Sequence, residues 1–534
     1  MGFVIWTLTA ALFFLVLLFT RSRSGLLGFA VADLVFWGLV LFGSSRLPKQ
    51  NQGTALKRVG VPFFLLHFSF FLIVFLNGTH IDAVDRWATL GAWKSRLSST
   101  AQPADHSAVT NEATASGYVA PLLESGGTES GKIRRYVWQG AISAWRSSTK
   151  TMLIGTGTET FAFAFYQFKP KGHNLTSEWD FLYNKAHNEY LNYLTTTGVL
   201  GLGSYLLFFG SFVLWFVKVQ MSKLKAQSNV KAQSSKNSLD FGFDWKFDIW
   251  ILELSLFAAW LSILVTNFFG FSVVVTQLFL FLFPAIIIAG NIRSDQHAVL
   301  VSLPFLASTH KRRIAAFIVM VAGLVIATRI GLLWYADTLF ASGYRASRID
   351  SYVQAADNIE RAIALNPGEP LYYDEAGSAL AGLAILAIEQ KDATGAAAFI
   401  KQSVRASDTA ITISPNNVNF WKTRTKIYYT FSAFDGAFND AAIEALEHAQ
   451  KLSPADPKIP YNLAILTGRN GQNDRSIELL KHTIDLKQNY RDAYYALWVF
   501  YKEIKKPELG RAILADYLTK VDPADKDFQE RMNE

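Results

Sequence analysis

The sequence predicts an all-α protein, with a polytopic helical membrane domain followed by an α-solenoid of paired helices. Apolar residues make up 51% of the 534 residues, and the apolar runs crowd into the first 335. Such crowding is typical of a chain that crosses a membrane several times. Residues 336–534 instead show helical periodicity interrupted by similar loops, which indicates stacked helix pairs.

Seven apolar runs are candidate membrane spans, because crossing a ~30 Å hydrocarbon core takes about 20 helical residues. The segment between the fifth and sixth runs, Thr266–Gly270, is so short that we expect a tight hairpin there. The predicted spans are Val4–Phe19, Leu26–Phe42, Val61–Leu76, Val199–Val217, Ile249–Phe268, Phe271–Ala289 and Ile314–Tyr335.

Lysines and arginines gather in the loops after the second, fourth and sixth runs. Alternation puts these three loops on one side, and cytoplasmic loops carry an excess of cations. The Arg21–Gly25 turn, the long loop 77–198 and everything after residue 335 then face outward. We therefore expect a membrane domain over 1–335 and an extracytoplasmic repeat domain over 336–534.

Composition excludes several functional classes. The chain has no cysteine, so disulfides, cysteine-ligated metals and a cysteine nucleophile are ruled out. The net charge of +8 lies largely in loops that flank apolar runs, where it sets topology. We find no nucleic-acid-binding signature and expect the lipid bilayer as the chain's surroundings.

Two arginines break the charge rule, because Arg21 and Arg23 lie in an outward turn. They are either snorkelling at the membrane interface or retained to bind an anion. Arginine suits phosphate, since it is permanently charged and presents five donors in a fork.

The long outward loop contains one further helix and one tight turn. Residues 98–132 are rich in Ser, Thr, Ala and Gly and predict a tether or lid. The segment Ile133–Ser148 has the periodicity of a helix and carries Arg134 and Arg135. One face of this helix is apolar, with Ile133, Val137, Ala141 and Trp145. Gly155-Thr156-Gly157 predicts a tight turn, because no Gly-Lys-Ser/Thr follows to make it a nucleotide loop.

His187 is the candidate catalytic residue of this loop. A lone histidine is more often structural, but this one lies at the membrane face on the side that holds the arginines. A neutral imidazole there can accept a proton near neutral pH. Metal ligation is disfavoured because no second histidine lies three or four residues away.

Three motifs occur in a fixed order along residues 10–290. They are Ser22–Gly25 at the end of a span, Arg134 and Trp138 ahead of Gly155-Thr156-Gly157, and Ala186–Leu191 leading into Thr197–Gly201. Together they resemble the O-antigen ligase and polymerase superfamily of bacterial envelope glycosyltransferases.

This resemblance implies a membrane fold of the lipid-sugar glycosyltransferase type in the cytoplasmic (inner) membrane. It implies transfer of a glycan from undecaprenyl diphosphate to an acceptor hydroxyl (on a lipid, protein or polysaccharide) without a nucleotide sugar, a metal or another cofactor. The diphosphate ligands map onto Arg23 with Arg21 beside it, and onto Arg134 with Arg135 as the alternative. The catalytic residue maps onto His187.

The chain departs from this family in one respect. Members usually carry several spans before the Ser-Arg motif, whereas one predicted span precedes it here. The expectation is therefore a fragment, a shifted start codon or half of a split gene, which is inactive alone if the absent spans shape the carrier groove.

Two carboxylates lie inside predicted spans, where an ionised group is expensive. For Glu253 we favour a structural hydrogen bond to another span over catalysis. Asp33 is expected to pair with an arginine of a neighbouring helix. Neither is predicted to be catalytic.

The last part of the chain carries repeats of tetratricopeptide type. Five similar inter-repeat loops occur, and the last three follow one another after 34 and 35 residues, the tetratricopeptide period. The earlier steps are longer, which predicts degenerate repeats. Small and aromatic residues are expected where the helices pack: Tyr461, Ala464, Gly468, Ala493, Tyr495 and Ala496.

The repeats predict a concave groove that holds a peptide or protein partner, with a plain spacer as the alternative. Two hypotheses for the whole chain follow. One is a glycan ligase, or a polymerase that differs only in its acceptor, with the repeats as a docking module. The other is a non-catalytic membrane scaffold that uses the repeats for assembly.

Overall fold

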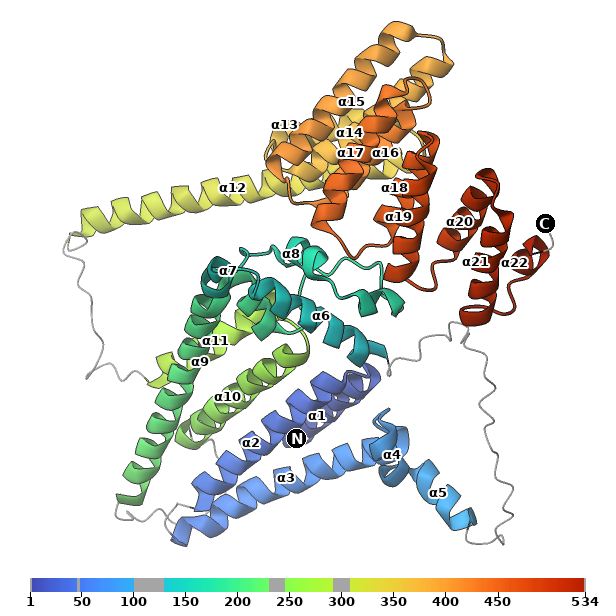
Figure 1. The fold of residues 1–534 in the computed structure, drawn as a ribbon. Helices are drawn as coiled ribbons and strands as arrows, with labels where there is room; N and C mark the ends of the chain where they lie inside the picture. Colours follow the sequence, from blue (N-terminus) through green and yellow to red (C-terminus); the bar gives the residue numbers. More distant parts are fainter. Residues whose placement is uncertain (1, 46–48, 100–128, 230–244, 292–307, 533–534) are drawn as a thin grey trace. The chain divides into compact units, whose positions relative to one another are not determined.

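The computed structural model describes residues 2–45, 49–99, 129–229, 245–291 and 308–532 (Figure 1). All regular secondary structure in these residues is helical, as predicted. The chain divides into two compact units. The membrane unit comprises Met1–Ala113, Ser148–Gly155 and Lys185–Ala298, and the repeat unit comprises Thr114–Ser147, Thr156–Asn184 and Val299–Glu534. The predicted tether at 98–132 falls largely outside the described residues.

Seven described helices are long and apolar enough to cross a membrane, judged by length and composition. Six of them coincide with predicted spans, although α11 begins three residues after the predicted start at Phe271. The seventh is α14 (Pro370–Glu389), which packs against α15 in the repeats. The first predicted span forms α1 (Gly2–Phe19), whose apolar stretch Ile5–Phe19 is shorter. The six are α2 (Arg23–Ser45), α3 (Lys49–Asn77), α9 (Glu189–Asn229), α10 (Trp245–Phe269), α11 (Val274–Asn291) and α12 (Thr309–Ser347).

Aromatic rings form the core of the membrane unit between α9, α10 and α11. Phe216 of α9 stacks on Phe257 of α10 with ring centroids 3.9 Å apart. Trp260 of α10 is fully buried and donates its indole N–H to the Leu280 carbonyl of α11 at 2.9 Å. This bond closes the predicted hairpin, although Thr266 and Asn267 belong to α10 and the turn itself starts at Gly270.

Both intramembrane carboxylates have polar partners from other helices. Glu253 of α10 accepts from Gln220 (3.1 Å) and Lys223 (2.6 Å) of α9 and from Asn291 (3.0 Å) of α11. The prediction of a structural bond for Glu253 is therefore confirmed. A buried carboxylate that is hydrogen-bonded on both oxygens and paired with a cation has most of its desolvation cost offset.

The partner predicted for Asp33 was wrong. Its carboxylate lies 3.0 Å from Nε2 of His67 on α3 rather than beside an arginine. The other ring nitrogen of His67 lies 2.8 Å from the Phe63 carbonyl, so both nitrogens of this imidazole have polar partners, as an apolar medium requires.

The long loop between α3 and α9 contains several short helices. The predicted helix at Ile133–Ser148 is α6 (Glu129–Trp145), whose residues Ile133, Val137 and Ala141 are buried as expected. It ends before Ser148 because that residue caps α7 (Thr149–Ile154), accepting from Thr151 N–H at 3.1 Å. The others are α4 (Asp82–Ala88), α5 (Leu90–Ser99), α8 (Phe161–Phe168) and the 3₁₀ turn η1 (Lys171–Leu175).

Two glycines allow α7 and α9 to cross with their backbones in contact. Gly155 (φ 75°) lies so close to Thr196 that a Cβ atom would be 2.3 Å from its carbonyl oxygen. Gly198 (φ 68°) kinks α9, and a Cβ atom there would be 2.3 Å from the Leu153 carbonyl oxygen. The two sequence motifs that contain these glycines therefore meet, and neither position has room for a side chain.

The repeats begin inside α12, so the expected boundary at residue 335 falls within one continuous helix. The second half of this helix packs on α13, where a Cβ atom at Gly343 would be 2.6 Å from Ile359. The following helices are α13 (Tyr352–Leu365), α14 (Pro370–Glu389), α15 (Ala393–Ile413), α16 (Val418–Phe431), α17 (Ala437–Leu452), α18 (Lys458–Arg469), α19 (Asn473–Leu486), α20 (Arg491–Glu503), α21 (Pro507–Lys520) and α22 (Lys526–Arg531).

The inter-repeat loops share one backbone geometry. Asn366, Ser414, Ser453 and Lys487 each end a helix with φ between −136° and −147° and ψ between 70° and 93°. The fifth loop differs, since Val521 has φ −117° and ψ −63°. The distance in sequence between the first two inter-repeat loops is longer because the helices between them are longer. α14 and α15 have 20 and 21 residues, whereas α18 and α19 have 12 and 14.

Most of the predicted packing residues are placed as expected. Ala464, Ala493 and Ala496 are buried, and a Cβ atom at Gly468 would be 2.3 Å from Phe500. Tyr461 is half-buried against Tyr490. Tyr495 was predicted wrongly, because it is exposed and lies under the guanidinium of Arg531.

Gly198→Ala should destabilise the membrane unit, whereas Gly203→Ala should not. Alanine at 198 meets both a left-handed backbone and the Leu153 carbonyl, which together cost roughly 3 kcal/mol. Gly203 lies in the same helix with open space around it, and alanine there favours the helix. Thermal unfolding of the purified protein in detergent measures both variants. Equal midpoints would show that the backbone crossing is not a constraint.

Candidate functional site

His187 has a strained backbone immediately before α9. Its φ is 50°, a left-handed conformation that is uncommon for non-glycine residues. The neighbouring Ala186 and Asn188 are both buried, and Asn188 caps α9 by accepting from Leu191 N–H at 3.0 Å. The half-buried imidazole packs edge-on against Phe271, with ring centroids 5.4 Å apart. Local structure therefore fixes the position of this side chain.

A cluster of polar side chains lies on α9, α10 and α11 at the same end of the membrane unit. Tyr190 donates to the Leu264 carbonyl at 2.9 Å, and the Tyr193 hydroxyl accepts from Gln277 at 3.4 Å. Asn267 is buried and accepts from Ser272 at 3.0 Å. Sequence reasoning missed this cluster, because each member is a single polar residue in an apolar run.

Arg21 and Arg23 lie at the turn between α1 and α2, and both are exposed. Arg21 has φ 51°, and Ser22 caps α2 by accepting from Gly25 N–H at 3.1 Å. Arg23 is the first residue of α2. The Ser-Arg-Ser-Gly motif is thus a helix start that holds the second arginine at a defined position.

The first turns of α2 and of α9 both contact the same part of α10. Gly28 of α2 lies against α10, where a Cβ atom would be 2.8 Å from Thr266. Tyr190 of α9 binds Leu264, two residues earlier on the same helix. Since five residues of helix rise about 7.5 Å, Arg23 lies at the end of the membrane unit that carries His187.

Arg134 and Arg135 lie on α6, which belongs to the repeat unit. Arg134 is half-buried beside the apolar face, and Arg135 is exposed. Within the described parts of the chain, Arg21, Arg23, Arg134 and Arg135 have no ion-pair partner. The structure therefore brings Arg23 and His187 to one end of the membrane unit and assigns Arg134 to the other unit.

A model of the O-antigen ligase family matches residues 8–206. The membrane part of the chain carries an O-antigen ligase domain. The matched range contains all five predicted site residues and ends within α9. The apolar helices are those of a multi-pass membrane protein, and residues 8–206 are similar to the O-antigen ligase family.

Solved structures that are similar to this chain include MamA, YrrB and a repeat protein of Thermus thermophilus. MamA from Desulfovibrio magneticus RS-1 is 16% identical with a TM-score of 0.28, and the match covers 36% of this chain and 97% of the MamA chain. YrrB, a repeat protein with an unusual peptide-binding site, is 13% identical with a TM-score of 0.27, covering 37% and 91%. A thermophilic repeat protein of Thermus thermophilus is 18% identical with a TM-score of 0.26, covering 37% and 97%. No curated protein matches the sequence.

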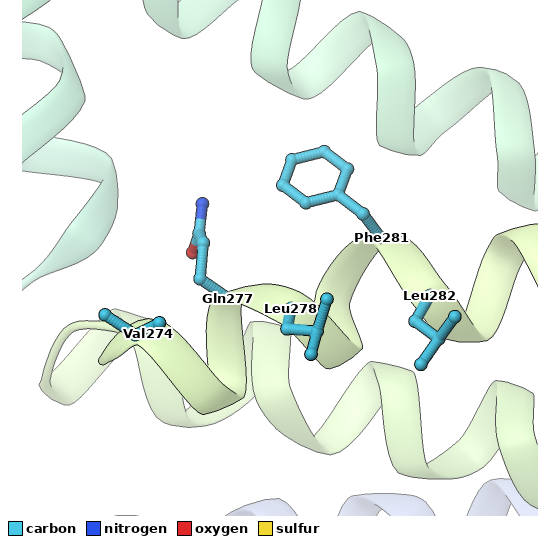
Figure 2. A pocket seen from close by; sticks show the side chains of 5 residues that line it. All are labelled: Val274, Gln277, Leu278, Phe281 and Leu282. Carbon is cyan, nitrogen blue, oxygen red and sulfur yellow. The ribbon is translucent and has the colours of Figure 1, made fainter. Parts of the chain in front are cut away.

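An apolar pocket lies on α11 of the membrane unit, beyond the range matched by the O-antigen ligase model. Figure 2 shows its lining side chains, all projecting from this one helix. Val274 and Leu278 are largely exposed, which suits contact with lipid tails. The lining residues are Val274, Gln277, Leu278, Phe281 and Leu282. No described group of three His, Asp or Glu side chains is arranged to hold a metal ion.

Part of the long loop of the O-antigen ligase domain packs within the repeat unit. His173 of this part is fully buried and contacts Tyr183. Burial, with a contribution from Lys169, lowers the pKa of His173 to about 4, so this imidazole is neutral and structural. Burial also lowers the pKa of Lys169 and of Lys487 to about 8, and Asp456 and Asp180 oppose the shift of Lys169.

The repeat unit should become more stable as the pH rises from about 8 to about 9, below the range in which the tyrosines of the unfolded chain ionise. Both lysines have a lower pKa in the folded protein than the ordinary 10.5. The unfolded chain therefore binds more protons in this window, and the free energy of unfolding increases with pH. Thermal midpoints followed by tryptophan fluorescence measure this rise, and Lys169→Met should remove part of it. An identical pH slope in the variant would contradict the assignment.

Proposed function

We propose that the chain transfers a glycan from undecaprenyl diphosphate to an acceptor hydroxyl at the outer face of the cytoplasmic membrane. The observation that carries this proposal is the position of His187 within an O-antigen ligase domain. Its strained backbone lies at the end of the membrane unit where α2 begins with Arg23. A base and a cation at one end of a membrane-embedded bundle suit a reaction at the lipid surface.

In the proposed reaction, His187 accepts the proton of the acceptor hydroxyl. The hydroxyl oxygen attacks the anomeric carbon of the lipid-linked glycan, and the bond from that carbon to the diphosphate oxygen breaks. Arg23 and Arg134, with Arg21 and Arg135 as neighbours, stabilise the charge that develops on the leaving undecaprenyl diphosphate. No metal takes part, because guanidinium groups supply the positive charge. Attack from the face opposite the leaving group gives an inverted anomeric configuration.

The apolar pocket on α11 supports a place for the carrier lipid. It begins at Val274, three residues after Phe271, which contacts His187. We place the isoprenoid chain along this face and the diphosphate at the end of the bundle. The excess of cations in the loops after α2, α9 and α11 supports an orientation in which this end faces outward.

His187→Asn should abolish transfer without unfolding the protein. Asparagine tolerates a left-handed backbone but cannot act as a general base, so a loss reports on chemistry rather than strain. The test is transfer from an undecaprenyl-diphosphate glycan by the purified chain in liposomes. His80→Ala is the control, because His80 likewise has a left-handed backbone (φ 58°) but is exposed. Wild-type transfer by His187→Asn would refute its role.

Arg23→Ala and Arg134→Ala should each lower the turnover number by roughly 10²–10³-fold, the usual effect of removing one group that stabilises a developing anion. Lysine at either position should restore activity only in part, because the two-pronged donor is lost. Arg146→Ala provides the control, since Arg146 is an exposed loop arginine over the Trp145 ring. Full activity of both lysine variants would argue against a diphosphate clamp.

A further inference from the structure

The repeat unit already holds a segment of its own chain. Asn174, in the loop between α8 and α9, is fully buried. Its side-chain amide donates to the carbonyls of Ala455 (2.8 Å) and Leu486 (3.0 Å). These carbonyls lie at two successive inter-repeat loops, after α17 and after α19. The ammonium of Lys487 returns a bond to the Asn174 carbonyl at 2.9 Å, so one residue bridges two repeats.

Further contacts extend this interface on both sides of Asn174. Lys171 forms an ion pair with Asp485 at 2.5 Å, and Asp180 forms one with Lys458. The Trp179 ring receives the ammonium groups of Lys487 at 4.6 Å and Lys458 at 5.2 Å. Ahead of them, Tyr166 packs on the core of α16, α17 and α18. The segment from Tyr166 to Asp180, called the docked segment below, thus binds the repeats through buried and charged contacts.

The docked segment also supports the helix that carries Arg134. Gly140 of α6 lies against α8, where a Cβ atom would be 2.6 Å from the Phe165 ring. Gly172 of η1 lies against Tyr136 of α6, where a Cβ atom on Gly172 would be 2.5 Å from the tyrosine hydroxyl oxygen. Neither contact leaves room for a side chain. A continuous series of packed contacts therefore runs from the repeats through η1 and α8 to α6.

We infer that the repeats act as a positioning element for Arg134, with the docked segment as their ligand and Asn174 as the central residue. The inference rests on the proposed function, in which Arg134 binds the diphosphate. It assigns the repeats a part in the turnover of the enzyme. If the repeats only recruited an acceptor, they would not need to bind the long loop of the ligase domain through a buried asparagine.

The test combines Asn174→Ala with a cross-linking readout that does not depend on activity. The chain has no cysteine, so Lys171→Cys with Asp485→Cys gives one reactive pair, which a short bismaleimide should bridge. Intact mass distinguishes the bridged product from two separate adducts. Asn174→Ala leaves two buried carbonyls without a donor, and bridging should slow about tenfold. Asn439→Ala is the matched control, because Asn439 is also buried and donates to a backbone carbonyl (Leu466, 3.2 Å), while its described hydrogen bonds stay within α18 and Asn470.

Transfer measured on the same variants decides whether docking positions Arg134. Asn174→Ala should lower the turnover number about tenfold, in step with the cross-linking, whereas Asn439→Ala should not. In the Arg134→Ala background, Asn174→Ala should cause no further loss, because residues that act through one another are not additive. Slower cross-linking with unchanged transfer, or a full second loss in the double variant, would overturn the inference.

Charge reversal covers the case in which Asn174→Ala does not fold. Lys171 and Asp485 are both exposed, so Lys171→Glu should fold, lower transfer and be rescued by Asp485→Lys in the same chain. Failure of this rescue would count against the inference. Wild-type transfer by Arg134→Ala would instead refute the role of Arg134 in the proposed function, while the cross-linking would still report whether the segment is docked.

Discussion

The contact between the backbones of α7 and α9 at Gly155 and Gly198 is the constraint on which the membrane unit depends. Each glycine occupies a left-handed conformation and lies against a peptide group of the other helix. No other residue type satisfies both conditions, because a Cβ atom would overlap a carbonyl group that is held by its own helix. The crossing anchors α7, which lies within the long loop, to α9, the helix that begins two residues after His187.

Two sets of paired polar groups join different helices of the membrane unit. Glu253 joins α9, α10 and α11, and the pair of Asp33 and His67 joins α2 and α3. In hydrocarbon an unpaired charge is costly, so each set selects one arrangement of its helices. Dispersion between apolar side chains is less selective, since many rotations of a helix bury similar areas.

The proposed catalytic residues come from two compact units of one chain. Arg23 and His187 belong to the membrane unit, and Arg134 belongs to the unit that contains the repeats. Arg134 lies in the long loop between α3 and α9, and this loop is hydrogen-bonded to the inter-repeat loops after α17 and α19. The backbone geometry of these inter-repeat loops recurs along the solenoid. Stacked repeats usually bind a partner on their concave surface. Here a segment of the same chain binds inter-repeat loops.

The sequence by itself determined the helical class, the positions of the apolar spans, the period of the repeats and the glycine turn at Gly155. These features follow from local chemistry, because hydrophobic length, periodicity and glycine spacing are read along the chain. It also placed Glu253 in a structural bond, since a lone intramembrane carboxylate needs a partner. Only the tertiary structure decided which partners meet. His67 bonds Asp33, Asn174 bonds carbonyls near residues 455 and 486, and the cluster around Asn267 forms from single polar residues of three helices. Such contacts join residues far apart in sequence, and their free energy depends on burial that the folded chain alone creates.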